Sequence, residues 1–238
     1  MKEEEILKKI KSRGFWRINI RPSTYNLFFS KSSECLTFVR KNIVDFTGWD
    51  YPHFAEVQSE IQAVENYSDF GMGWSDAGPH KEYWRLYRSG QFIHYMCIGD
   101  DWWEDDFWKR DWLMNRTPMT HIGAVYDLLS PVTSIFEFCK KLAEQNILGR
   151  EFNLSIQIIG LKNRKLWMQS DKLVLARTGV CKENEFKEEK VFTSEEIILN
   201  TQELSLQTLS RIYDLFKWNV SLESLKVYQN NLKERGDI

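Results

Sequence analysis

The spacing of apolar residues along the chain predicts helices and strands in irregular order. Helical spacing marks the segments 2–13, 33–47, 54–64, 118–129, 131–146, 203–217 and 221–234. Alternation, or enrichment in branched and aromatic residues, marks strands at 15–22, twice within 82–98, and at 152–158, 166–168 and 173–176. We expect Gly14 to end the first helix as a left-handed cap, Ser33 to cap the second, and the glycine-rich stretch 66–79 to form a loop.

This order of elements predicts the fold class. Because strands and helices do not alternate regularly, we expect an α+β fold, with mainly antiparallel strands packed against helices and a helical C-terminal end. The best boundary lies at Thr117-Pro118, between an aromatic-rich α+β domain (1–117) and an α+β domain with two C-terminal helices (118–238). A single domain is the alternative.

Composition narrows the classes of function. The formal net charge of −2 lacks the basic excess of proteins that bind duplex nucleic acid through many phosphates. The four cysteines lie far apart without a C-x-x-C pair, which predicts reduced thiols and a cytoplasmic protein. No apolar run reaches the roughly 18 residues of a membrane span, so we expect no membrane partner.

The chain is rich in tryptophan, with ten in 238 residues, and its aromatic residues crowd around the segment 84–95. If the hairpin turns tightly at Ser89-Gly90, its register sorts the side chains between two faces. One face then carries a core, with Trp84 opposite Tyr95 and Leu86 opposite Ile93. The other face carries Arg85 opposite His94, flanked by Tyr83, Tyr87 and Phe92.

The second of these faces is the candidate binding site. A cation and an imidazole framed by aromatic rings can bind an anionic or planar ligand. Arg17 and Arg21 join this surface if the strand 15–22 neighbours the hairpin. The alternative is a face covered by helices, in which Arg85 pairs with a carboxylate such as Asp100 or Asp101.

The segment 100–112 is the most acidic part of the chain. Its carboxylates at Asp100, Asp101, Glu104 and Asp105 could hold Mg²⁺ for hydrolysis. Acidic residues in a first helical turn, followed by apolar pairs at helical spacing, explain the same residues as one end of an amphipathic helix.

No catalytic motif accompanies these residues. Nucleophile elbows, Walker loops, Rossmann glycines and kinase signatures are absent, and the four histidines lack metal-ligand spacing. We therefore predict a protein without a cofactor that is not an enzyme.

Three segments resemble uncharacterised bacterial proteins. They are Trp16-Arg17-Ile18-Asn19-Ile20-Arg21-Pro22, Gly48-Trp49-Asp50-Tyr51-Pro52-His53 and the stretch 83–92. Some of those proteins are associated with Schlafen-like, AlbA-type DNA-binding domains and with phage defence. The resemblance covers about the first hundred residues. It implies an accessory component of a bacterial multiprotein system and transfers no site residue.

These observations rank three functions. The first is a non-catalytic binding or sensing component whose hairpin face binds a partner protein, a second copy or an anionic small molecule. The second is a metal-dependent hydrolase or nuclease that uses the acidic segment. The third is a single-stranded nucleic-acid binding protein with bases stacked on aromatic rings beside arginines.

Overall fold

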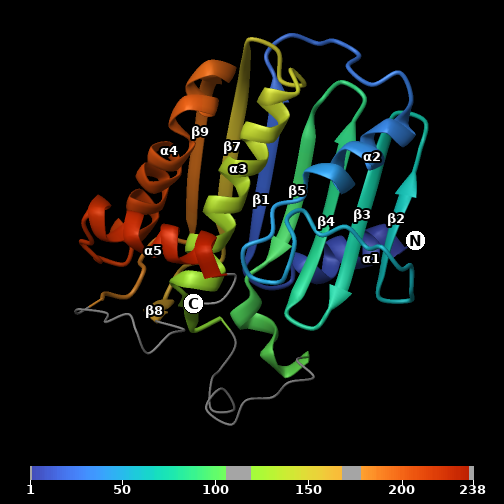
Figure 1. Ribbon diagram of the computed structural model, residues 1–238. Coiled ribbons are helices and arrows are strands. Elements are labelled where there is room, and N and C mark those ends of the chain that lie inside the picture. Colours follow the sequence, from blue (N-terminus) through green and yellow to red (C-terminus); the bar gives the residue numbers. More distant parts are fainter. Residues whose placement is uncertain (1, 106–118, 168–177, 236–238) are drawn as a thin grey trace.

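The computed structural model describes residues 2–105, 119–167 and 178–235 and confirms the α+β fold (Figure 1). The helices are α1 (Lys2–Ile10), α2 (Ser32–Asn42), α3 (Ser130–Glu144), α4 (Ser194–Asp214) and α5 (Leu222–Arg235), with the shorter segments η1 (Gly99–Asp105) and η3 (Val125–Leu129). The strands are β1 (Phe15–Pro22), β2 (Gln62–Asn66), β3 (Phe70–Ala77), β4 (His80–Tyr87), β5 (Phe92–Cys97), β6 (His121–Gly123), β7 (Glu151–Ile159), β8 (Lys165–Trp167) and β9 (Glu185–Thr193).

Most of the strands belong to one antiparallel sheet. Seven of them follow the order β2-β3-β4-β5-β1-β7-β9, while β6 and β8 form a separate parallel pair. β1 lies between β5 and β7 and pairs with both. Strands from before and after residue 117 therefore share this sheet, and the division into domains 1–117 and 118–238 stays a prediction.

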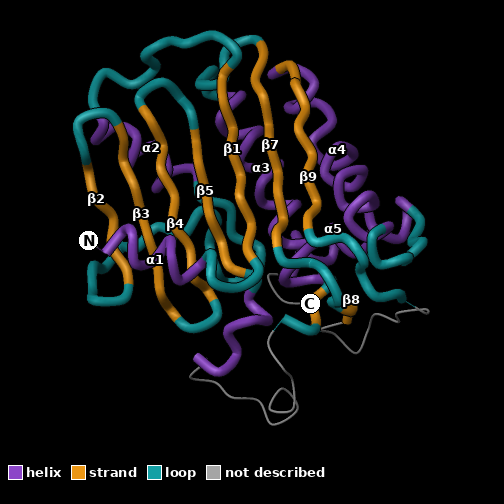
Figure 2. Tube along the Cα trace, turned by 180° about the vertical axis from the view of Figure 1, so that it is seen from behind, coloured by secondary structure: helices purple, strands orange, loops and turns teal. Residues whose placement is uncertain are grey.

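The helices are divided unequally between the two faces of the sheet. α2, α3 and α4 cover the face that we call the inner face, and the main hydrophobic core lies between them and the sheet (Figure 1). On the opposite, outer face, α1 contacts β3, β4 and β5. No other helix of the described residues covers that face, so within the described part of the chain β1, β7 and β9 carry no helix there (Figure 2).

Several predicted elements are confirmed. β1 has the expected alternation, with Trp16, Ile18 and Ile20 buried. β4 and β5 form the hairpin, and α3 buries apolar residues that recur at helical spacing. The two C-terminal helices are present, although α4 begins earlier than predicted. The predicted strand 173–176, Met168 and Pro118 lie outside the described residues.

The predicted helix over 54–64 and the predicted loop over 66–79 are both wrong. No helix occupies 54–64, and Val57 and Ile61 are 72% and 47% exposed, so their spacing does not mark a buried face. The stretch 66–79 contains β3. Its glycines permit close packing, because a Cβ at Gly71 or at Gly73 would lie 2.6 Å from an atom of Leu36 or Trp84.

Two further predictions need correction, and one strand was not predicted. Residues 121–123 form β6, and the helical part of 118–129 begins at the π-helical segment η3. Lys31 rather than Ser33 precedes α2, without a side-chain cap. β9 escaped prediction because its sequence is mostly charged, with Phe186 and Phe192 as its buried residues.

Gly14 does not form a left-handed cap. It lies instead against a buried ion pair, in which the guanidinium of Arg164 contacts the carboxylate of Asp101 at 2.5 Å and both side chains are 0% exposed. The Gly14 amide donates a hydrogen bond to the same carboxylate at 2.9 Å. This pair joins the start of β1 to η1 and to the turn after β7.

Within the described part of the chain, no helix combines the length and the apolar character that crossing a membrane requires. All four cysteines are buried and free.

Candidate binding face

The hairpin has a different register from the predicted one. Its loop contains three residues, since the amide of Tyr87 donates to the carbonyl of Gln91 at 2.9 Å and Gly90 takes the left-handed conformation, with φ of 82°. Arg85 therefore pairs with Ile93, and Trp84 pairs with His94. The assumed two-residue turn is wrong, and a shift of one residue moves one strand's side chains to the other face.

This register separates the predicted site residues. Tyr83, Arg85 and Tyr87 belong to the outer face, together with Arg17 and Arg21, because β1 does neighbour β5. His94 and Phe92 belong to the inner face, where both are fully buried. The predicted pairing of Arg85 with His94 is therefore corrected, whereas the condition for including the two β1 arginines is met.

Arg85 is already paired within the fold. Its guanidinium forms an ion pair with Glu3 of α1, donates to the hydroxyl of Tyr87 at 3.3 Å and lies 4.4 Å from the ring centre of Phe70. The side chain is 24% exposed. A carboxylate partner was the predicted alternative for Arg85, but this partner is Glu3 rather than Asp100 or Asp101.

Two arginines lie on the part of the outer face that no described helix covers (Figure 2). Arg17 and Arg21 are exposed, and neither pairs with a carboxylate among the described residues. Around them lie uncharged polar side chains from three neighbouring segments. We call this set the outer polar face: Arg17, Asn19 and Arg21 on β1, Asn153, Ser155 and Gln157 on β7, and Gln91 before β5.

Cross-strand pairing orders this outer polar face into rows. Arg17 lies between Tyr95 and Gln157, and Asn19 lies between Ile93 and Ser155. In the third row Arg21 pairs with Asn153. The side chain of Gln91 donates to that of Asn19 at 2.9 Å. The sheet thus holds amide groups, which donate and accept hydrogen bonds, beside two cations.

The charges on the next strand are largely satisfied. On β9, Lys187 and Glu189 lie 4.0 Å apart, and the side chain of Asn153 donates to Glu189 at 3.2 Å. Towards α1, Lys11 lies 4.6 Å from the ring centre of Tyr95, which forms the border with the covered half. Lys187 and Lys11 thus have contacts within the fold, whereas Arg17 and Arg21 on β1 have no carboxylate partner among the described residues.

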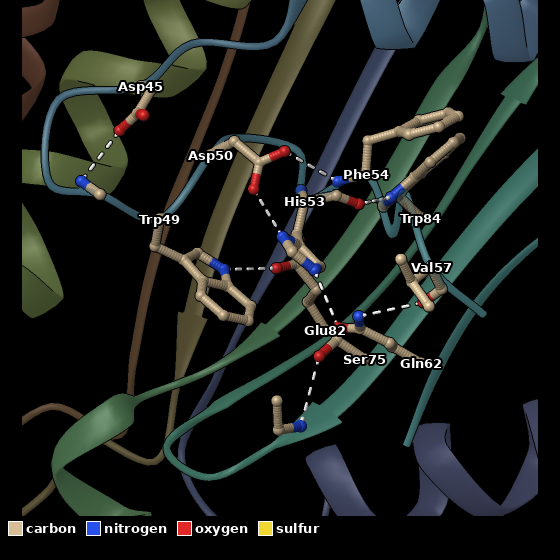
Figure 3. A network of polar contacts seen from close by, with 12 residues as sticks. Asp45, Trp49, Asp50, His53, Phe54, Val57, Gln62, Ser75, Glu82 and Trp84 are labelled. Carbon is tan, nitrogen blue, oxygen red and sulfur yellow. Dashed lines mark hydrogen bonds and ion pairs between the residues drawn. The ribbon is translucent and has the colours of Figure 1, made fainter. Parts of the chain in front are cut away.

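A second polar group lies on the inner face, beneath the loop 44–55 (Figure 3). Buried Glu82 accepts hydrogen bonds from the indole of Trp49 (2.9 Å), the amide of His53 (3.1 Å) and Nε2 of His94 (2.8 Å). Burial raises the pKa of Glu82, but these hydrogen bonds and the histidine charges outweigh it and hold the pKa below its ordinary value.

His53 joins that loop to the edge strand β2. Its Nδ1 contacts Asp50 at 2.5 Å, and its Nε2 contacts Oε1 of Gln62 at 3.1 Å. The amide group of Gln62 donates to Val57, so Gln62 presents an acceptor to the imidazole. Burial lowers the pKa of His53, but Asp50 and Glu82 outweigh it and raise the pKa. This network fixes the loop through contacts of His53 with Asp50, Gln62 and Glu82.

The two carboxylates that the structure describes in the acidic segment both have partners. Asp101 is bound to Arg164, and buried Asp100 accepts a hydrogen bond from the indole of Trp167. The side chains of Glu104 and Asp105, with residues 106–118, lie outside the described part. Among the described residues, no group of three or more His, Cys, Asp or Glu is placed to hold a metal ion.

Compared with protein-family models, with curated proteins and with solved structures, the chain gives no match.

Proposed function

We propose that this chain is a non-catalytic binding component that uses the outer polar face to bind an anionic partner, with a protein as the first choice. The observation that carries the proposal is the pair Arg17 and Arg21, which are exposed and which, among the residues the structure describes, have no carboxylate partner and no covering helix (Figure 2). Arginine binds carboxylates and phosphates through two parallel hydrogen bonds and is frequent at interfaces. Membership of a bacterial multiprotein system, including one of phage defence, is the corresponding biological setting.

The alternative is that this half of the face is simply solvated, as one face of many antiparallel sheets is. Two features favour binding. Arg17 and Arg21 stand on one strand with the same orientation, and the positions directly opposite them on β7 carry the amides of Gln157 and Asn153 rather than carboxylates. An anionic partner would supply the carboxylates that these directly paired positions lack.

An NMR titration with poly-L-glutamate tests the proposal. We expect ¹⁵N–¹H shifts to concentrate on β1, β7 and the start of β5, and to shrink as salt is added, because exposed charges are screened. Absence of shifts at low salt, or shifts centred on α4 and α5, would overturn the proposal.

A further inference from the structure

We infer that the partner's binding element is an extended acidic peptide segment with carboxylates four residues apart. The inference rests on the proposed function and names the occupant of the same face. Its starting point is the spacing of Arg17 and Arg21, which point to the same side of β1 and lie ~13 Å apart at ~3.3 Å per residue. An extended peptide has the same rise, so side chains at positions j and j+4 match both arginines.

The size of the face favours a segment over a second sheet. Strands of eight and nine residues in β1, β7 and β9 span about 26–30 Å along the chain and about 14 Å across, from the usual strand dimensions. That is roughly 400 Å², about half of what each partner contributes to a stable protein interface. It is enough for one extended segment of about eight residues.

The uncharged side chains suit a peptide backbone. An extended segment lying on the face has N–H and C=O groups that need partners. Asn19, Gln157 and Asn153 carry side-chain amides that donate and accept, and they alternate with the arginines across the rows. The carboxylates would then bind the guanidinium groups while the amides bind the backbone.

The acidic residues at the two ends of the face argue against nucleic acid. Glu185 lies at one end of β9 and Glu151 at the opposite end of β7, and both are exposed. A phosphodiester chain carries charge at every unit and would meet both carboxylates. A peptide whose only two acidic residues lie opposite Arg17 and Arg21 carries fewer charges and leaves its other positions near Glu185 and Glu151 neutral.

Fluorescence anisotropy with labelled nine-residue peptides tests this occupant. Two peptides of identical, threonine-rich composition carry two glutamates, either four or three residues apart, and threonine favours the extended form. The second spacing puts the carboxylates on opposite sides. We expect the four-residue spacing to bind at least about threefold more tightly, and Arg17→Ala/Arg21→Ala to weaken that binding about tenfold or more, as charge-assisted bonds are lost.

The control is Lys187→Ala, which removes a cation from the neighbouring strand and is expected to leave the affinity within about twofold, because that lysine is paired with Glu189. Equal affinity for both spacings would overturn the inference. So would binding of a twelve-residue oligothymidylate through Arg17 and Arg21 without peptide binding, although the proposed anion-binding function would then stand. If no anionic probe depends on the two arginines, the inference and the proposed function both fail.

Discussion

Replacement of Glu82 by glutamine tests how strongly the inner network holds the loop 44–55. Glutamine keeps the volume and one acceptor oxygen, but its NH₂ group must face one of the donors that the carboxylate now accepts. The least costly orientation turns the NH₂ group towards the indole of Trp49, because the other oxygen serves His53 and His94. One unsatisfied donor costs about 1–3 kcal/mol, and loss of the charge-assisted bond to His94 adds about 1 kcal/mol. We therefore expect the free energy of unfolding to fall by about 2–4 kcal/mol, a large part of the 5–15 kcal/mol typical of a domain.

Urea unfolding followed by tryptophan fluorescence at pH 7 measures this loss. The dependence of the unfolding free energy on urea concentration should stay unchanged while the midpoint falls, because unfolding exposes the same amount of surface in the variant as in the wild type. Glu60→Gln, at an exposed position, is the matched control and should lie within about 0.5 kcal/mol of the wild type. Since the folded pKa of Glu82 is lowered, its stabilisation is present above the unfolded pKa and is lost as pH falls through the folded pKa. The Glu82→Gln variant should not show this loss of stability at acidic pH. A loss of unfolding free energy below about 0.5 kcal/mol in the variant would show that the three hydrogen bonds to the Glu82 carboxylate do not stabilise the loop more than an amide does.

Other parts of the fold give further expectations. Gly14→Ala places a Cβ against Nη2 of Arg164, closer than van der Waals contact, so the unfolding free energy should fall by about 1–3 kcal/mol, and an unchanged urea midpoint would contradict the close approach. Burial and the neighbouring carboxyl of Asp100 raise the pKa of Asp127, so the contribution of Asp127 to stability should fall as pH rises from its unfolded pKa towards its folded one. Asp100→Asn should flatten that fall, as seen in melting temperatures across pH, and an equally steep fall would contradict the coupling. The raised pKa of His53 means that its stabilisation is full below the unfolded pKa and is lost as pH rises through the folded pKa. NMR titration of the imidazole should give a pKa above that of the unfolded chain, and an equal or lower value would contradict the contacts.

Period-two patterns predicted the sheet best. The alternation in 15–22 and 152–158 identified β1 and β7 and the faces of their residues, because each strand has one face in the core. Glycine misled the prediction of β3, where Gly71 and Gly73 serve close packing rather than a turn. β9 has too few apolar residues for its pattern to show.

The candidate site was predicted in part. The pattern in 15–22 placed Arg17 and Arg21 on one face, but their neighbours depend on strand order, which pairing distant in sequence decides. The same alternation set Asn153, Ser155 and Gln157 between apolar residues, and this was the available signal for the β7 part of the outer polar face. The hairpin register could not be derived, since it depends on whether the loop holds two residues or three.

The inner network was not predicted either. Asp50, His53 and Gln62 lie within thirteen residues of one another, but Glu82 reaches them from another strand. Carboxylates and imidazoles carry no periodic signal, so only the folded arrangement brings these side chains together.

Charge reversal at Arg17 and Arg21 on β1 tests whether the outer polar face is the binding surface. We would titrate the wild type and Arg17→Glu/Arg21→Glu with poly-L-glutamate at low salt and compare their urea midpoints. We expect binding by the wild type, no detectable binding by the variant, and closely similar midpoints, because both side chains are exposed. Equal binding by the two proteins would contradict the claim that the outer polar face is the binding surface.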